Sequence, residues 1–144
     1  MFLRVTAALK AIKPVVFLAL LTKDVTGLNH YIHFDDVKLN VGNAYSPIHG
    51  VFVAPYNGTY QFTLTACSVP THYVVLEFYI NTLVYDRLLA GDQDFTQCSS
   101  KTIFASLKEN DDVFVKQHAQ YGDFLKADNG YGLPSFGGVF LSAN

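Results

Sequence analysis

Apolar and polar residues alternate with a period of two along much of this chain. The clearest stretch follows the Pro-Tyr-Asn-Gly sequence at residues 55–58, where every second residue is apolar and Gln or Thr lies between. The apolar positions of this stretch are Tyr60, Phe62, Leu64 and Ala66. Such alternation, built from aromatic and β-branched residues, is typical of an antiparallel strand with one buried face. We predict this strand over residues 59–67.

Similar short segments recur along the chain, separated by turn-forming residues. The other segments predicted to be strands are residues 15–21, 50–53, 73–80, 83–90, 99–107, 113–117 and 136–141. No stretch after residue 22 keeps a helical period over three turns. Short strands at this spacing, with turn signals between them, predict one all-β domain, either a sandwich or a jelly roll.

Two segments depart from simple alternation. Residues 15–21 are a continuous apolar run after Pro14, which predicts a strand buried on both faces. Residues 31–40 contain scattered apolar side chains without a regular period, so we expect an irregular segment there. Residues 121–134 are rich in Gly and Asp and predict a long loop.

The N-terminal residues are apolar but interrupted by Arg4, Lys10 and Lys13. A membrane-spanning helix needs about 20 apolar residues, so no span is predicted. Lys10 and Lys13 fall where a secretory signal would have its apolar core and cleavage region, so this is a poor signal. We therefore divide the chain into a lead-in segment, 1–13, and a domain, 14–144. A leader absent from this sequence and a helical or disordered lead-in are both open alternatives.

Composition narrows the function classes. Of 144 residues, half are hydrophobic and 15% are charged, which excludes a disordered chain. The formal net charge is -2 and there is no long basic run, so we expect no nucleic-acid partner. The sequence has no Gly-x-Ser-x-Gly motif, no Gly-rich phosphate loop and no carboxylate pair in an apolar setting. It therefore predicts a protein that is not an enzyme.

Five histidines raise the question of a metal site. His30 and His33 are three residues apart, which in an extended segment places the two rings on opposite faces. No Glu or Cys stands nearby at a metal-ligand spacing, and the chain has no His-x-His pair. A structural or surface role is favoured for these histidines.

The spacing of residues between 34 and 64 resembles the signature of the complement C1q globular head domain family. The residues that occupy its positions are Phe34, Asn40, Tyr45, Phe52, Gly58, Tyr60 and Phe62. Leu64 stands where the family prefers Phe or Tyr, and Asn110 replaces the Gly of a family turn over residues 107–113. Asn best substitutes for Gly where φ is positive. The resemblance extends over about residues 14–142.

This resemblance implies a jelly-roll sandwich of about ten strands, like that of the tumour necrosis factor family, assembled as a trimer. It implies a secreted, extracellular recognition module without catalytic activity. The chain has no collagen-like repeat and is most similar to stalkless invertebrate, especially molluscan, members. These act as lectin-like pattern recognition molecules for carbohydrate or microbial surfaces in innate immunity. One rival interpretation is an extracellular-matrix or receptor-ligand trimer that binds no glycan; another is a metal-dependent jelly-roll enzyme.

The family topology also implies a disulfide between Cys67 and Cys98. In that topology, the strand that holds Cys67 runs antiparallel to the strand that starts after Cys98, so the two ends lie together. In the chain-entropy model the bond contributes about 3–4 kcal/mol to stability. The alternative is two reduced cysteines in neighbouring strands.

Asp92 and Asp94, with Gln93 and Gln97 beside them, form an acidic loop. Oxygen ligands on a flexible loop suit calcium. Calcium-binding relatives hold their ions near the apex of the trimer, where the corresponding loop supplies ligands. The resemblance thus makes Asp92 and Asp94 candidate calcium ligands, and a solvated acidic loop is the favoured interpretation.

Two further sets of residues have more than one interpretation. Residues 57–59 (Asn-Gly-Thr) form a glycosylation sequon at Asn57, yet Asn-Gly is also a sequence that tight hairpin turns need for positive φ. We expect the turn, with glycosylation as an additional role. The aromatic residues Tyr60, Phe62, Phe136 and Phe140 could lie in the core of one chain or at the threefold interface.

Overall fold

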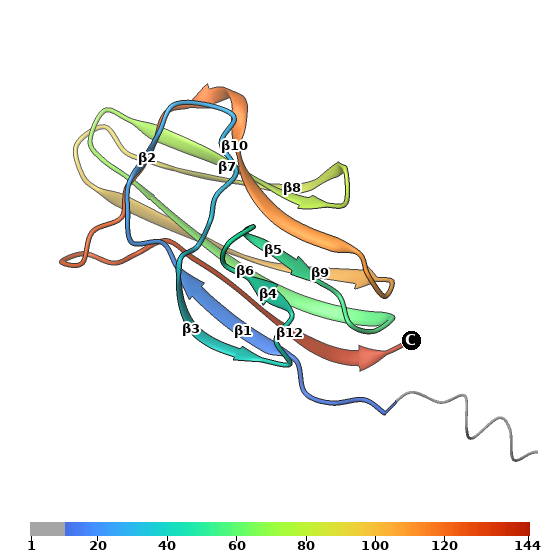
Figure 1. Ribbon diagram of the computed structural model, residues 1–144. Helices are drawn as coiled ribbons and strands as arrows, with labels where there is room; N and C mark the ends of the chain where they lie inside the picture. The colour runs from blue at the N-terminus through green and yellow to red at the C-terminus, as the bar shows by residue number, and fades with distance from the viewer. Residues whose placement is uncertain (1–10) are drawn as a thin grey trace, which may run out of the picture.

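The computed structural model describes residues 11–144, which fold into two packed β-sheets (Figure 1). The described residues contain no helix. The strands are β1 (Val16–Leu20), β2 (Val25–Thr26), β3 (Asp36–Val41), β4 (Tyr45–Ser46), β5 (Val51–Val53), β6 (Gly58–Ser68), β7 (Tyr73–Ile80), β8 (Leu83–Gly91), β9 (Gln97–Leu107), β10 (Asp112–Gly122), β11 (Phe124–Leu125) and β12 (Ser135–Ala143). Most of the expected lead-in segment, and the region of the leader prediction, lie outside the described residues.

Strands that neighbour each other in a sheet are mostly distant in sequence. Sheet I has the order β3-β1-β12-β6-β9 and sheet II the order β4-β5-β10-β7-β8, while β2 and β11 pair separately. All of these pairs are antiparallel, which gives a jelly-roll sandwich. The prediction of an all-β jelly roll is confirmed, with twelve strands in place of about ten.

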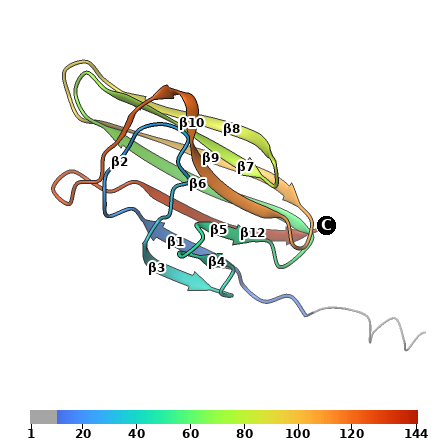
Figure 2. The same cartoon turned by 45° about the horizontal axis from the view of Figure 1, so that its top comes forward.

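The described ends of the chain lie at one end of the sandwich, which we call the proximal end (Figure 1). At the other, distal end, the β6–β7 loop and the β8–β9 loop lie side by side in both views (Figures 1 and 2). The pairing of β6 with β9 runs the whole length, from Gly58↔Leu107 at the proximal end to Ser68↔Gln97 at the distal end. These long central strands position the distal loops.

The signature residues build the interior between the sheets. Tyr45 is buried, and its hydroxyl donates a hydrogen bond of 2.9 Å to the carbonyl of Phe34. The Asn40 amide donates to the Tyr45 carbonyl (2.9 Å) and accepts from the Tyr45 N–H (3.3 Å). Phe17 stacks against both Tyr45 and Phe52, with ring centroids about 5 Å apart. Burial raises the pKa of the Tyr45 hydroxyl, which keeps it protonated as a donor.

The aromatic set with two interpretations belongs to the core of a single chain. Tyr60, Phe62 and Phe136 are fully buried between the sheets, and Phe140 is partly buried against the same core. The Tyr60 hydroxyl donates to the Tyr56 carbonyl at 2.8 Å, so its polar atom is satisfied inside the core.

The predicted tight hairpin turn at Asn57-Gly58 was wrong. Neither residue has a positive φ, and β5 and β6, which the turn was expected to join as a hairpin, belong to different sheets. Gly58 serves close packing instead, because a Cβ atom there would lie 2.3 Å from the Ser142 carbonyl oxygen and 2.6 Å from the Phe140 ring. The chain bends here to pass from sheet II to sheet I, where β6 pairs with β12.

Three other segments differ from prediction. The expected strand at residues 15–21 is β1, but only one face is buried in the single chain, since Leu18 is 37% exposed. The expected irregular segment contains β3, whose pairing with β1 shifts register at a bulge between Leu18 and Ala19. The bulge leaves Lys38 without a partner in β1. Residues 36–41 themselves alternate between polar and apolar side chains, so the signal for β3 was present in the sequence. The expected long loop contains β11, and β10 extends to Gly122.

The turns at Asn81 and Asn110 agree with prediction. Both residues have positive φ, 56° and 75° respectively, the conformation for which Asn substitutes for Gly. Asp111 serves the second turn, because its carboxylate accepts from the Lys108 N–H at 2.9 Å and from the Asn81 side chain at 3.1 Å.

Side chains of β8 and β9 close one edge of the sandwich. Lys101 lies 2.8 Å from the Asp86 carboxylate, and the Tyr85 hydroxyl donates to the Phe104 carbonyl at 2.8 Å. Partial burial alone would raise the pKa of Asp86, but the hydrogen bonds from Lys101 and from the Arg87 N–H, together with the charge of Lys101, outweigh it, so the pKa is lowered. This edge is therefore held by polar contacts across the two sheets.

Tyr45→Phe should lower the free energy of unfolding by about 1–2 kcal/mol, because it removes a buried hydrogen bond. Tyr85→Phe is a matched control, since its hydroxyl also donates to a carbonyl but the side chain is 51% exposed. We expect a change below about 0.5 kcal/mol for the control. Equilibrium unfolding in urea measures both, and equal losses would contradict the role given to Tyr45.

Candidate functional site

A disulfide anchors the distal end of the sandwich. Cys67 and Cys98 face each other in the pairing of β6 with β9 and are joined by a disulfide bond, as the resemblance implied. The bond closes a loop with a sequence separation of 31 residues, which includes β7 and β8. It therefore ties together the two strands from which the distal loops emerge.

A groove of about 400 Å³ lies directly beside this disulfide; we call it the distal groove. Its lining residues come from the β6–β7 loop, the β8–β9 loop, β9 and the segment before β12. They are Pro70, Asp94, Phe95, Thr96, Cys98 and Tyr131. Segments distant in sequence thus meet at one end of the fold, as loops on a rigid sandwich commonly do at binding sites.

Hydrogen bonds within the β8–β9 loop fix one wall of the distal groove. The Asp92 carboxylate accepts from the backbone N–H of Asp94 (2.9 Å) and of Phe95 (3.0 Å). The Thr71 N–H donates to the Asp92 carbonyl at 3.2 Å, which ties the β6–β7 loop to this wall. The Gln97 side chain accepts from the Gly91 N–H at 2.7 Å. Asp92 therefore orders its own loop, as Asp does in many turns.

The opposite wall is the tip of the segment before β12. The Asp128 carbonyl accepts from the Gly132 N–H at 2.9 Å, and its carboxylate accepts from the Gly130 N–H at 2.7 Å. Lys126 lies 3.5 Å from the Asp24 carboxylate, which holds the base of the segment. Tyr131 is presented at the tip of this small turn.

Two aromatic side chains of the distal groove are strongly exposed. Phe95 is 71% exposed and Tyr131 is 73% exposed. The Asp94 carboxylate beside them has no hydrogen-bond or ion-pair partner among residues 11–144. Exposed aromatic faces and a free acceptor can hold a ligand that has an apolar face and hydroxyl groups. The sequence pointed to this loop through its acidic residues, but gave no signal for Tyr131.

The predicted calcium ligands are only partly available. Asp92 and Asp94 lie in the same loop, but the Asp92 carboxylate is already occupied by two backbone N–H groups. Among the described residues, no three or more His, Cys, Asp or Glu residues are grouped so as to hold a metal ion. Since calcium takes six to eight oxygen ligands, residues 11–144 of one chain do not fit such a site alone.

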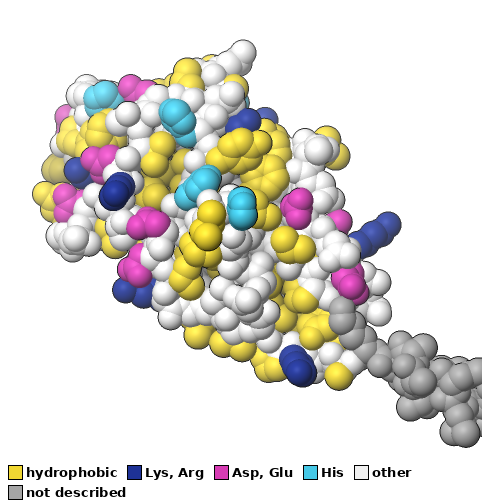
Figure 3. Space-filling model, viewed as in Figure 1, with side chains coloured by type: hydrophobic (Ala, Val, Ile, Leu, Met, Phe, Trp, Pro, Cys, Tyr) yellow, Lys and Arg dark blue, Asp and Glu magenta, His cyan; other side chains and the backbone are white. Residues whose placement is uncertain are grey.

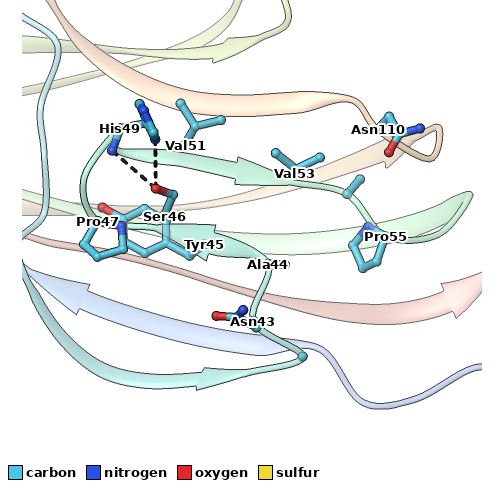
Figure 4. A pocket seen from close by; sticks show the side chains of 12 residues that line it. Asn43, Ala44, Tyr45, Ser46, Pro47, His49, Val51, Val53, Pro55 and Asn110 are labelled. Carbon is cyan, nitrogen blue, oxygen red and sulfur yellow. Dashed lines mark hydrogen bonds between the residues drawn. The ribbon is translucent and has the colours of Figure 1, made fainter.

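A larger groove of about 820 Å³ lies along the edge strands β4 and β5 (Figure 4). It has no charged side chain in its lining. Ser46 and His49 come together there, with 3.1 Å between the hydroxyl and Nδ1 (Figure 4). Asn43 and Asn110 add neutral polar groups at its rim. This groove was not predicted from the sequence, because Tyr45 and the residues around it were identified only as part of the family signature.

Histidine side chains form a band on the face shown in Figure 3. His30 and His33 are exposed, and neither belongs to a group of metal ligands among the described residues. His72 lies 3.1 Å from the Asp123 carboxylate, and His118 lies 3.9 Å from Glu77. His72 and His118 thus each pair with a single carboxylate, whereas His49 contacts the Ser46 hydroxyl.

The sequon residue Asn57 is exposed at the proximal end. Its side-chain oxygen accepts from the Glu109 N–H at 2.7 Å, which links it to the β9–β10 turn. Asn57 stays a predicted glycosylation site. A glycan there would lie at the opposite end of the sandwich from the distal groove.

The fold defines a jelly-roll domain with a cluster of loops at its distal end. The sequence profile described as the C1q domain matches residues 16–141. The chain therefore belongs to the C1q domain family.

Individual relatives agree with this family. The chain is 30% identical over 113 residues to "Heavy metal-binding protein HIP" of Mytilus edulis, covering 75% of this chain and 52% of the relative. The chain thus spans about half the length of that relative.

Solved structures with the same fold include the globular domain of zebrafish complement 1qA. It has a TM-score of 0.73 and 17% identity, covering 90% of this chain and 99% of the other. Murine APRIL has a TM-score of 0.64 and 13% identity, covering 90% of this chain and all of the other. At these identities the likeness shows the fold alone. Within residues 11–144, no helix is long and apolar enough to cross a membrane.

Removing the disulfide should destabilise the domain by about 3–4 kcal/mol in the chain-entropy model. The double variant Cys67→Ser, Cys98→Ser tests this by urea unfolding beside the oxidised and the reduced wild type. The double variant should match the reduced wild type and should not respond to reductant. If full reduction, verified by intact mass, leaves the unfolding midpoint unchanged, the anchoring role is contradicted.

Proposed function

We propose that the chain is a secreted, non-enzymatic recognition module that binds carbohydrate or other microbial surface ligands in the distal groove. C1q domain proteins are generally extracellular and typically act as binding modules without catalytic activity. The observation that carries the proposal is the pair of exposed rings, Phe95 and Tyr131, beside the free carboxylate of Asp94. Large aromatic side chains exposed to this degree at a groove mark a ligand site.

The chemistry of the distal groove suits a sugar ring. The rings of Phe95 and Tyr131 can pack on the apolar C–H face of a pyranose, while Asp94 and Thr96 accept hydrogen bonds from its hydroxyls. The groove holds a volume of about 400 Å³, enough for one or two sugar rings. A single shallow site of this kind binds weakly.

We further propose that three chains associate through the outward face of sheet I. Its strands β1, β6 and β12 contain no charged residue and no histidine. The one charged residue of β9, Lys101, bonds Asp86 of sheet II and so is not part of this face. Several apolar side chains of the face are exposed, namely Leu18, Leu39, Val41, Phe104 and Leu141. The edge strand β3 adds one ion pair, Lys38 with Asp36 at 2.9 Å. A face with uncharged central strands and exposed apolar side chains supports self-association.

A trimer would place three distal grooves on one particle. Binding to a surface with repeated glycans then gains from effective concentration, since the second and third contacts are intramolecular. Weak single sites are therefore compatible with firm attachment to a microbial surface. In the same assembly, the Asp92 and Asp94 loops of different chains could pool oxygen ligands for calcium, which is the form in which we retain that prediction.

Glycan and microbial-polysaccharide arrays, run with calcium and with chelator, test the proposed function. Phe95→Ala and Tyr131→Ala should each weaken binding by roughly three- to tenfold, as expected for loss of an aromatic contact. Leu83→Ala is the control, because Leu83 is 74% exposed but lies outside the groove. Asp92→Asn and Asp94→Asn should remove any calcium dependence. No binding in either condition would reject the carbohydrate version.

That negative result would favour the alternative function, a structural or receptor-ligand trimer. Such a protein would keep its assembly, ignore glycans and bind one protein partner. The distal groove variants would then change neither the array signal nor the oligomeric state.

Metal binding is a second candidate function, favoured by the name of the Mytilus edulis relative, "Heavy metal-binding protein HIP". In this chain, His72 is the best-oriented histidine, because Asp123 holds its Nδ1 side and leaves Nε2 as a ligand atom. Titration calorimetry with zinc and cadmium should show binding that is lost in His72→Ala and retained in His49→Ala. Binding equal in both variants would remove His72 from this role.

A further inference from the structure

A row of side chains crosses the outward face of sheet II. The register pairs Arg87 of β8 with Glu77 of β7, Glu77 with Lys116 of β10, and Lys116 with Tyr31. Directly paired residues of neighbouring strands point to the same face. Arg87, Glu77, Lys116 and Tyr31 therefore form one line, with charges that alternate in sign and an aromatic ring at its end.

Three aromatic rings flank the cationic end of this row. Phe114 stacks on Tyr79, with centroids 5.0 Å apart and an interplanar angle of 7°, and it lies 5.4 Å from the Tyr31 ring. The Lys116 ammonium lies 5.1 Å from the Tyr31 centroid and 5.8 Å from that of Tyr79. Tyr31 is 56% exposed, so this platform is open to solvent. Hydrophobic side chains gather beside Lys and Arg side chains over the region of β10 (Figure 3).

The two cations of the row retain binding capacity. No carboxylate of residues 11–144 lies within ion-pair distance of the Lys116 ammonium, which contacts rings instead. The Arg87 Nε–H donates a hydrogen bond of 2.9 Å to the Glu77 carboxylate. No described residue accepts a hydrogen bond from the two terminal guanidinium nitrogens. The Glu77 side chain is only 7% exposed, whereas that of Arg87 is 54% exposed. Glu77 therefore orients the guanidinium, while the outward surface presents mainly positive charge.

We propose that this outer row is a second binding site, which takes an acidic polysaccharide whose sugar rings bear carboxylate or sulfate groups. The terminal fork of Arg87 matches both anions in geometry, and Lys116 supplies a point charge. Neighbouring strands are about 4.8 Å apart, so the backbones of β8 and β10, which carry the two cations, are about 10 Å apart, and the cations engage successive anions of one chain. The rings of Tyr31 and Phe114 pack against the sugar rings. This proposal does not depend on ligand binding in the distal groove.

Titration of the full chain with dextran sulfate, polygalacturonate and neutral dextran of matched length tests the outer row. Lys116→Gln and Arg87→Gln should each weaken binding to the preferred anionic polymer roughly tenfold or more, and Tyr31→Ala roughly threefold. The charge variants should also reduce the salt dependence of binding, whereas Tyr31→Ala should not. The first two polymers distinguish sulfate from carboxylate as the recognised group.

Lys38→Gln is the matched control, since Lys38 is an exposed lysine paired with Asp36 away from the aromatic platform. It should leave affinity unchanged, as should Phe95→Ala in the distal groove. Arg87→Gln removes the closest ion pair of the buried Glu77, which keeps the Tyr79 hydroxyl at 3.4 Å and His118 at 3.9 Å. If that variant does not fold, Arg87→Lys replaces it and should weaken binding, because Lys lacks the guanidinium fork. Equal losses in Lys38→Gln and Lys116→Gln, equal binding of neutral dextran, or equal binding of duplex DNA would each overturn the proposal.

Discussion

Burial of aromatic side chains between two sheets is the constraint on which the rest of this structure depends. Phe34, Tyr45, Phe52, Tyr60 and Phe62 are almost completely removed from water. Each fully buried side chain of this size contributes about 1.5–3 kcal/mol. The hydrogen bonds of Tyr45 to Phe34 and Asn40 satisfy the polar atoms that such burial would otherwise leave without partners. The core thereby fixes long strands, and the strands fix where the distal loops emerge.

Because the core is complete within one chain, the outer surfaces are free to differ. The outward face of sheet I is uncharged along its central strands and suits contact with copies of the same chain. The outward face of sheet II has ordered charges and exposed rings and suits a polar, anionic partner. The distal loops, held by the Cys67–Cys98 bond, present a third surface. One sandwich can thus combine assembly with more than one contact to a polymeric ligand.

Much of the fold could be predicted from the sequence, for identifiable reasons. Strand β6 has one buried face along most of its length and shows a clean period of two, and Asn81 and Asn110 mark turns with positive φ. The prediction failed where a different constraint acted. The bulge in β3 follows from its pairing with β1, and Gly58 is required by the approach of β12 and not by a tight turn. Both depend on which strands become neighbours, which a local pattern does not encode.

The candidate sites were less accessible to prediction than the fold. The acidic residues of the β8–β9 loop drew attention to the distal end, but Tyr131 reaches that groove from a segment more than thirty residues away. The outer row is assembled from four separate segments by strand register. Such convergence appears only once the topology is known. The fold could therefore be predicted from the sequence more completely than the surface sites.

The mass in solution tests the central claim, that sheet I assembles the chain and leaves the other surfaces free, most directly. Sedimentation equilibrium should give three times the 16.0 kDa chain mass for the wild type and the single-chain mass for Phe104→Glu. Leu89→Glu, which adds the same charge at a 62% exposed site on sheet II, should remain trimeric. A wild type of single-chain mass, or dissociation by Leu89→Glu and not by Phe104→Glu, would contradict the account.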